Sequence, residues 1–216
     1  MKISVLCSDP DHPVLPRLRQ WRSEMQALGH DVSLLHDKGD LTGGDLLFLV
    51  SCTQIIGHAE RRDYGAALVL HASDLPKGRG WSPHVWSILQ GADRITVCLL
   101  EAKEPVDSGP VWFRTSFTLQ GHELLPEINA RLFSAELELM TRAVHEFGTV
   151  EPLAQSGDPG PYLNKRTTEH SRLDVQKTIA EQFDLLRVVD NLRYPAFFDH
   201  RGKRYRLTIK KADDEA

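Results

Sequence analysis

Short apolar runs and amphipathic stretches alternate along the first half of the chain. Between the first two runs, apolar residues recur at steps of three and four, and Gly29 ends the helix that this spacing predicts. Ser82-Pro83 opens a further helix, which Gly91 closes. Strand–helix alternation of this kind is typical of an α/β fold with a doubly wound, mainly parallel sheet. The runs predict β-strands at residues 2–7, 31–35, 46–50, 67–71 and 95–101, and the first helical stripe is Leu18, Trp21, Met25 and Leu28.

A long helix and then a boundary follow in the second half. The helix ends at Gly148, and residues 151–161 are rich in Pro, Gly and Ser, which marks a linker. We therefore predict a main domain over residues 1–150, a small C-terminal unit over 162–211, and a disordered tail over 212–216. The apolar stripe of the long helix is Leu125, Ile128, Leu132, Ala135 and Leu139.

The C-terminal unit is expected to consist of one helix and a β-hairpin. Ser171 and Asp174 fit a capping box at the start of that helix. Residues 196–199 and 203–209 predict two strands joined across residues 200–202, and the exposed edge of this hairpin is a possible homodimer contact. The expected apolar face of the helix is Ile179, Phe183, Leu186 and Val189.

Composition narrows the class of protein. The formal net charge is −4, whereas a general nucleic-acid binder is more often strongly basic. No apolar run approaches the roughly 20 residues that a membrane span needs, and the first residues are too short an apolar run for a signal peptide. Three cysteines lie in or beside strand-like runs, which is typical of reduced, buried thiols and predicts a cytoplasmic protein: Cys7, Cys52 and Cys98.

Two common ligand motifs are missing. Cys7-Ser8-Asp9-Pro10 follows the first predicted strand, where dinucleotide- and nucleotide-binding proteins carry a glycine-rich loop. No His/Cys cluster has the spacing of a zinc site, so we expect no metal.

The best catalytic candidates are His71, which ends a predicted strand, and Asp107. A helix and a strand separate the two residues, and an alternating parallel sheet would place both at the same edge. A carboxylate beside an imidazole fixes its tautomer and suits general-base chemistry. Taken alone, a His and an Asp in loops are more often just polar groups on the protein surface.

Residues 70–83 and 106–111 add a specific resemblance, which covers most of residues 1–150. They are similar to the signature of the 10-formyltetrahydrofolate-dependent formyltransferase family, Asn-x-His-x-Ser-Leu-Leu-Pro-x-x-Arg-Gly followed by Asp-x-Gly. The matching residues are His71, Ser73, Leu75, Pro76, Arg79, Gly80, Asp107 and Gly109.

The C-terminal unit resembles the end of bacterial nucleotide-sugar N-formyltransferases. Ser171-Arg172-Leu173-Asp174 and Tyr194-Pro195-Ala196-Phe197-Phe198 carry much of this likeness. The loop after His71 resembles a short subgroup related to pseudaminic-acid-type sugar formyltransferases and to formylation domains of peptide synthetases.

The resemblance implies a Rossmann-like fold in which residues 1–150 form the catalytic domain. It also implies transfer of a formyl group from 10-formyltetrahydrofolate to the amine of a nucleotide-linked amino deoxysugar. His71 would act as general base and oxyanion stabiliser, oriented by Asp107. The implied folate-binding residues are Thr53, Gln54, Ile55, Lys103, Glu104, Pro105 and Val106.

The substrate residues that we expect are Ser73, Lys77, Arg79, Trp81, Lys165 and Arg166. Lys165, Arg166 and also Arg172 are candidates for diphosphate contacts, since guanidinium groups suit phosphate, although a solvated linker explains them as well.

The sequence departs from the family at two positions. Val69 stands where the family has its catalytic Asn, which removes a side-chain donor to the oxyanion. Ser73, Gln54 and backbone amides are the candidate replacements. Trp81 stands where sugar-modifying relatives often carry Arg.

The same residues are compatible with other functions. A formyltransferase that acts on glycinamide ribonucleotide or on a peptide-linked amine would use the same His and Asp. Methionyl-tRNA formylation is disfavoured because a basic tRNA-binding appendage is missing. Val69 would also suit a catalytically silent folate- or nucleotide-binding protein.

Overall fold

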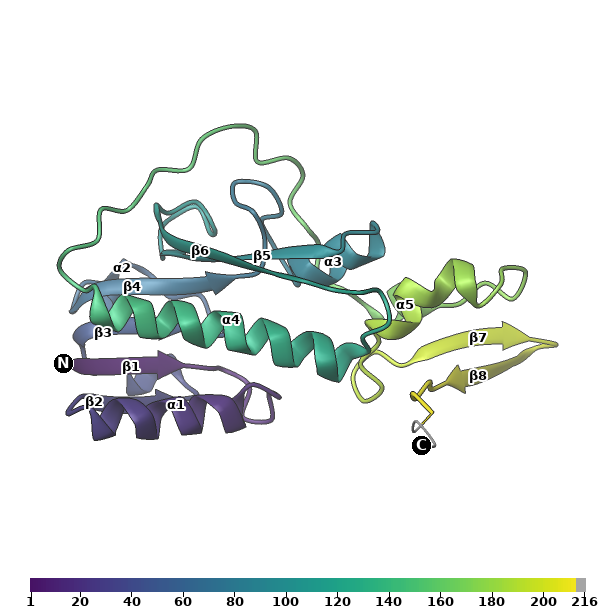
Figure 1. The fold of residues 1–216 in the computed structure, drawn as a ribbon, viewed down its shortest axis with the longest axis horizontal. Helices are drawn as coiled ribbons and strands as arrows, with labels where there is room; N and C mark the ends of the chain where they lie inside the picture. Colours follow the sequence, from purple (N-terminus) through teal and green to yellow (C-terminus); the bar gives the residue numbers. More distant parts are fainter. Residues whose placement is uncertain (213–216) are drawn as a thin grey trace.

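The computed structural model describes residues 1–212 and has a six-stranded sheet at its centre (Figure 1). The strand order is β2-β1-β3-β4-β5-β6, and the first four strands of this order are parallel. The strands are β1 (Lys2–Leu6), β2 (Asp31–Leu35), β3 (Gly44–Leu49), β4 (Tyr64–His71), β5 (Arg94–Glu101) and β6 (Val111–Thr118).

Two long helices, α1 (Leu15–Ala27) and α4 (Leu125–His145), cover one face of the sheet (Figure 1). Their apolar stripes pack against β1, β3 and β4 in the largest core cluster. The other helices are α2 (His58–Arg61), α3 (Pro83–Leu89) and α5 (Phe183–Arg187), with 3₁₀ turns η1 (Lys38–Asp40), η2 (Thr168–Ser171) and η3 (Ala180–Gln182). The predicted stripe of α1 is buried except for Leu28, which caps the helix and is exposed.

The mainly parallel α/β sheet is confirmed, but its last two strands run the other way. β5 is antiparallel to β4, with His71 opposite Cys98, and β6 is antiparallel to β5. His71 and Asp107 do lie together, as predicted, but the prediction that parallel neighbouring strands place them there is wrong. β5 ends at Glu101, beside Leu68 in the middle of β4, and the loop after Glu101 brings Asp107 back to His71.

Sequence reasoning missed β6 and the short helix α2. The run Val111–Thr118 is rich in β-branched and aromatic residues, which is a strand signal in itself. β6 extends the sheet to its edge, and its first residue exchanges two backbone hydrogen bonds with Leu153.

The predicted linker lies against the main domain. After α4 the chain runs as a long loop over β6 and β5 toward α5 (Figure 1). We name residues 151–166 the crossing segment, because it bonds to β6 at Leu153 and to the loop after β4 at Leu163. The proposed division of the chain into units stays a prediction.

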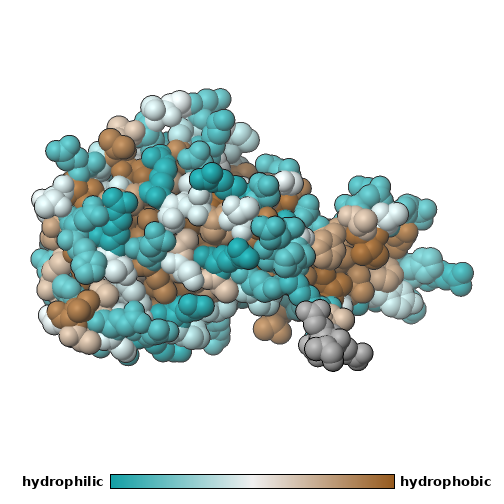
Figure 2. Space-filling view, in the orientation of Figure 1, coloured by the Kyte–Doolittle hydropathy of each residue, from teal (hydrophilic) through white to brown (hydrophobic). Residues whose placement is uncertain are grey.

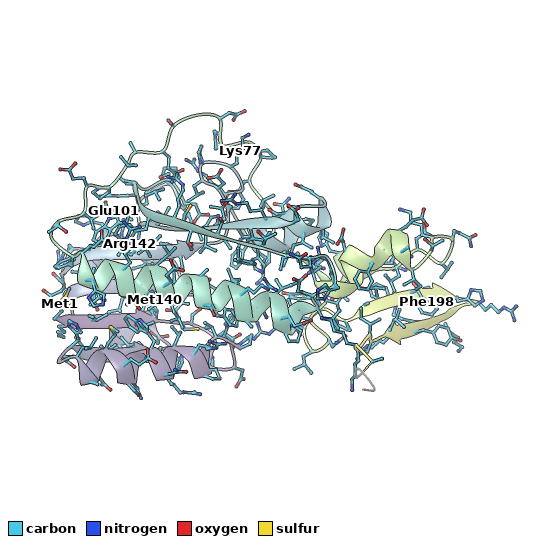
Figure 3. All side chains as sticks on the ribbon, in the orientation of Figure 1. Met1, Lys77, Glu101, Met140, Arg142 and Phe198 are labelled. Carbon is cyan, nitrogen blue, oxygen red and sulfur yellow. The ribbon has the colours of Figure 1, made fainter. Side chains whose placement is uncertain are left out.

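The C-terminal unit holds the predicted hairpin, β7 (Ala196–His200) and β8 (Lys203–Leu207), joined by a tight turn. Figure 2 shows apolar side chains gathered over this unit, and Phe198 is labelled on the hairpin in Figure 3. Residues 213–216 of the predicted disordered tail lie outside the described residues.

The helix predicted before the hairpin is wrong in two respects. α5 spans only Phe183–Arg187, and Ile179 is exposed rather than part of an apolar face. The predicted capping box at Ser171 and Asp174 is absent, because the box forms one turn earlier between Thr167 and His170. The amide of Asp174 instead donates to the side chain of Gln182.

Candidate active site

His71 is the last residue of β4 and shares one face of that strand with Val69. Leu68 and Leu70 point to the opposite face, where they join the core beneath α1 and α4. His71 therefore lies on the face that the long helices leave uncovered, at the carboxyl end of a central strand. Its side chain is buried.

Both ring nitrogens of His71 face oxygen atoms. Nε2 lies 2.9 Å from the carbonyl oxygen of Gly78, and because a carbonyl only accepts, Nε2 carries the hydrogen. Nδ1 faces Asp107 Oδ1 at 3.6 Å. A proton taken up at Nδ1 would thus lie beside a carboxylate, which stabilises the imidazolium.

Asp107 is held in place from several sides. Its backbone has a φ of 61°, in the left-handed region that Asp tolerates better than most residues. The amide of Gly80 donates a 3.0 Å hydrogen bond to Oδ2, so the two carboxylate oxygens face Gly80 and His71 separately. The side chain is 6% exposed, which weakens the screening of its charge by water.

Gly109 explains the Asp-x-Gly pattern. A Cβ at this position would lie 1.9 Å from the carbonyl oxygen of Glu101, far inside contact distance. Only glycine allows the loop that carries Asp107 to fold back against the end of β5.

Sequence reasoning missed the contribution of the crossing segment to this site. Gln155 donates to the carbonyl oxygens of Asp107 and Gly109 and accepts from Arg79. Leu163 exchanges backbone hydrogen bonds with Arg79 and Trp81, on either side of Gly80. Burial raises the pKa of Tyr162, and the charge of Asp107 raises it further. These contacts could not be predicted from the sequence, because the crossing segment has no regular secondary structure and its partners lie far away in the chain.

The two loops expected to bind folate are clasped together by Arg61 of α2. Arg61 donates to the carbonyl oxygens of Gly57 and Ala102 and pairs with Glu104 at 3.3 Å. Arg61 thereby ties α2, which follows the loop with Thr53, Gln54 and Ile55, to the loop over Lys103–Val106. Ile55 and Val106 expose apolar side chains, 71% and 48%, on these loops.

Among the expected substrate residues, the structure brings Trp81 and Lys165 together. The Lys165 ammonium lies 4.9 Å from the centre of the Trp81 ring, a cation–π contact. Lys77 is exposed on the loop after β4, near the top of Figure 3. Ser73 is buried, and its hydroxyl has no hydrogen-bond partner.

Three of the predicted arginines are engaged within the protein. Arg79 bonds to Gln155. Arg166 is buried and donates to His170 and Ser171 of η2, so it is not part of a solvated linker. Arg172 pairs with Glu169 and Asp199.

His84 of α3 is a further half-buried group that sequence reasoning missed. Its Nδ1 is buried without a partner. Burial lowers the pKa of His84 to about 4, and the nearby His71 and Arg166 act in the same direction. His84 is therefore a neutral imidazole near His71.

The side chain of Val69 packs against apolar neighbours, including Leu75 and Leu100. Of the candidate replacements for the missing Asn, one is engaged in other hydrogen bonds and one is buried. The Gln54 amide is bonded to Asp37 and Lys38, and the Ser73 hydroxyl is shielded from solvent.

Residues 1–212 contain no group of three or more His, Cys, Asp or Glu side chains arranged to hold a metal ion. No helix in the same range is long and apolar enough to cross a membrane.

The fold and the site together define an α/β protein with a buried His71–Asp107 pair at the end of a central strand. A family model described as formyl transferase matches residues 16–144, more than half of the chain. The chain belongs to the formyl transferase family, which is a family of enzymes.

A curated relative agrees with this assignment. A methionyl-tRNA formyltransferase of Rickettsia massiliae is 27% identical over 149 residues, which are 68% of this chain and 48% of that protein. The chain thus spans about half the length of the curated relatives it matches.

Several solved structures cover the chain along its whole length. A methionyl-tRNA formyltransferase from Clostridium thermocellum superposes with a TM-score of 0.83 at 18% identity, covering 100% of this chain and 95% of that one. A sugar N-formyltransferase from a Shewanella species gives a TM-score of 0.71 at 15% identity, covering 100% and 99%. At these identities the likeness establishes the fold.

Proposed function

We propose that the protein transfers a formyl group from 10-formyltetrahydrofolate to the amino group of a nucleotide-linked amino deoxysugar. The observation that carries this proposal is the buried His71–Asp107 pair, held between the two loops that bear the formyl transferase signature. Membership of the formyl transferase family supports the group transferred.

His71 accepts the proton that the substrate amine loses as its nitrogen bonds to the formyl carbon. In the arrangement described, Nδ1 is the free base, since Nε2 donates to Gly78. Asp107 lies beside Nδ1 and stabilises the imidazolium, which then returns its proton to the departing folate nitrogen. General acid–base assistance of this kind contributes about 10²–10⁴-fold to the rate.

No side chain takes the place of the family's Asn in our account. Val69 cannot donate, while Gln54 is engaged and the Ser73 hydroxyl is shielded. The remaining donors are backbone amides of the loop after β4 and the protonated His71 itself. Replacing Val69 with Asn would bring an amide against Leu75 and Leu100, so we expect lower stability and lower turnover. Higher turnover in this variant would show that a missing Asn limits the reaction.

The residues of the two clasped loops fit a folate. A pterin is planar and carries several donors and acceptors, which suit backbone groups, and its flat faces suit the exposed Ile55 and Val106. The co-substrate supplies the formyl carbon when it is bound. Arg61 holds the two loops close together before binding.

Two features favour a sugar nucleotide over transfer RNA. The net charge of −4 gives no general attraction to a polyanion, whereas the paired Trp81 and Lys165 offer a ring for stacking and a cation for phosphate.

The proposal is tested by incubating the protein with 10-formyltetrahydrofolate and a panel of nucleotide-linked amino sugars. Mass spectrometry then detects the gain of one formyl group. Glycinamide ribonucleotide, methionyl-tRNA and a peptide-linked amine are included as competing acceptors. We expect a product with one of the sugars, and a product with only one of the other acceptors would refute the sugar assignment.

A further inference from the structure

We infer that Gln155 is a positioning residue for the His71–Asp107 pair, and that the crossing segment is a working part of the active site. This inference rests on the proposed function, because it assigns a role within the same reaction. Gln155 lies 48 residues from Asp107 in the chain, within the stretch whose composition predicts only a linker.

The Gln155 amide uses all of its hydrogen-bonding groups at the site. Nε2 donates to the carbonyl oxygen of Asp107 at 2.9 Å and to that of Gly109 at 2.8 Å. Oε1 accepts from Arg79 Nη2 at 3.0 Å. A primary amide has two donor hydrogens and one acceptor oxygen, so one side chain joins the Asp107 loop to the loop after β4.

These contacts act on the backbone that aims the Asp107 carboxylate. Asp107 has a left-handed backbone, and rotation of that backbone would move Oδ1 away from His71 and Oδ2 away from the Gly80 amide. Gly80 is itself fixed by the same segment, since Leu163 bonds to the residues on both sides of it. A Cβ at Gly80 would lie 2.3 Å from the Leu163 carbonyl oxygen, which shows how closely the two backbones approach.

Gln155 is half-buried and lies beside the loops, whereas the core packs on the other side of the sheet. The loss of its side chain should therefore change the aim of Asp107 more than the stability of the fold. A displacement of about 1 Å at a catalytic group can cost about 10²-fold in rate.

Three variants separate the contacts of Gln155. Gln155→Leu removes both donors and the acceptor, while Gln155→Glu keeps an acceptor for Arg79 and removes the donors to Asp107 and Gly109. Ser156→Ala, at the exposed neighbouring position, is the matched control. We expect kcat to fall about 10²-fold in both Gln155 variants, with KM within about twofold, and no change in the control. Full activity of Gln155→Glu would overturn the inference, because the Arg79 contact would then be the important one.

A double-mutant cycle distinguishes positioning from a general structural role. If Gln155 acts through Asp107, Gln155→Leu should cost little further activity in a protein that already carries Asp107→Asn. Independent, multiplicative losses in kcat would contradict the inference. Gln155→Asn, which keeps the amide on a shorter side chain, replaces Gln155→Leu in the cycle if the latter fails to fold.

Hydrogen exchange of the Gly80 amide gives a readout that needs no substrate. This amide donates to Asp107 Oδ2, so its exchange should become faster in Gln155→Leu and stay unchanged in Ser156→Ala. Faster exchange in a protein that formylates no tested amine would support the positioning contact and count against the proposed function. Unchanged exchange in Gln155→Leu would overturn the inference whatever the activity.

Discussion

The backbone amide of Gly80 donates a hydrogen bond of 3.0 Å to Asp107 Oδ2, while Oδ1 of the same carboxylate faces His71. Gly80 belongs to the loop after β4 and Asp107 to the loop after β5. This contact brings the two halves of the family signature together. Oδ2 fixes the orientation of the carboxylate, while Oδ1 presents its charge to His71.

Asp107→Asn tests the charge alone. Asn has nearly the same shape, tolerates the left-handed backbone, and can still accept from the Gly80 amide. We expect a stable protein whose kcat is lower by about 10²–10⁴-fold, because the imidazolium loses its carboxylate. Steady-state kinetics and a thermal melt check both parts, and wild-type turnover would remove Asp107 from the mechanism.

Gly109→Ala tests the close approach at the end of β5. The new Cβ would meet the Glu101 carbonyl oxygen at 1.9 Å, so the Asp107 loop must move. Forced displacement of this kind costs about 1–3 kcal/mol, and we expect a lower melting temperature together with a large loss of kcat. The control is Gly39→Ala, which meets only the flexible Asp37 carboxylate, at 3.0 Å. Equal effects of the two substitutions would argue against a special role for Gly109.

Arg61→Met tests the clasp between the two loops proposed to bind folate. The loops lose their shared partner, and we expect KM for 10-formyltetrahydrofolate to rise while kcat at saturation changes little. Arg62→Met is the matched control, since Arg62 is exposed and pairs only with its neighbour Asp63. A rise in KM for the amino sugar instead would place that substrate on these loops.

Trp81→Leu and Lys165→Gln test the stacked pair at the crossing segment. If the pair holds the nucleotide, each variant should raise KM for the sugar nucleotide and leave KM for the folate unchanged. Kinetics with each substrate varied in turn separates the two effects. Unchanged KM for both substrates would show that the pair is only a surface contact.

Glu136 of α4 predicts a pH dependence of stability. Burial raises the pKa of Glu136 to about 8, against an ordinary value of 4.5. Between these values the folded protein holds a proton that the unfolded chain has released. The free energy of unfolding should therefore fall as pH rises through this range, by at most about 1.4 kcal/mol per pH unit.

Urea unfolding of Glu136→Gln from pH 5 to 8 measures this contribution, because Gln cannot ionise. The stability of the variant relative to wild type should increase with pH. Glu138→Gln, at an exposed position of the same helix, serves as the control. Parallel pH curves for wild type and Glu136→Gln would contradict the prediction.

The fold was predictable wherever apolar periodicity was strong. β2 matches its predicted bounds, and α4 follows its predicted stripe. The direction of β5 was not predictable from such patterns. β5 is buried on both faces, and a strand in that position is a continuous apolar run whether it is parallel or antiparallel to its neighbours. The helix predicted around Ile179 was wrong for a different reason, since the polar and charged residues near Ile179 allow turns as readily as a helix.

The site was predictable where a motif names its residues. His71 and Asp107 do meet, although by another route through the sheet. The contacts of Gln155 and Arg61 could not be predicted, because each side chain bonds to backbone carbonyls far away in the chain, which no local sequence pattern indicates. The homodimer and the cytoplasmic location stay predictions.

The most direct test of the account is transfer of an isotopic label. The protein is given 10-formyltetrahydrofolate labelled in the formyl carbon, together with the amino sugar nucleotide found in the acceptor screen. We predict that the label enters the sugar amide with wild-type protein and that Asp107→Asn and His71→Ala slow this transfer by at least about 10²-fold. Label transfer at the wild-type rate in both variants, or no transfer to any amino sugar, would contradict the account.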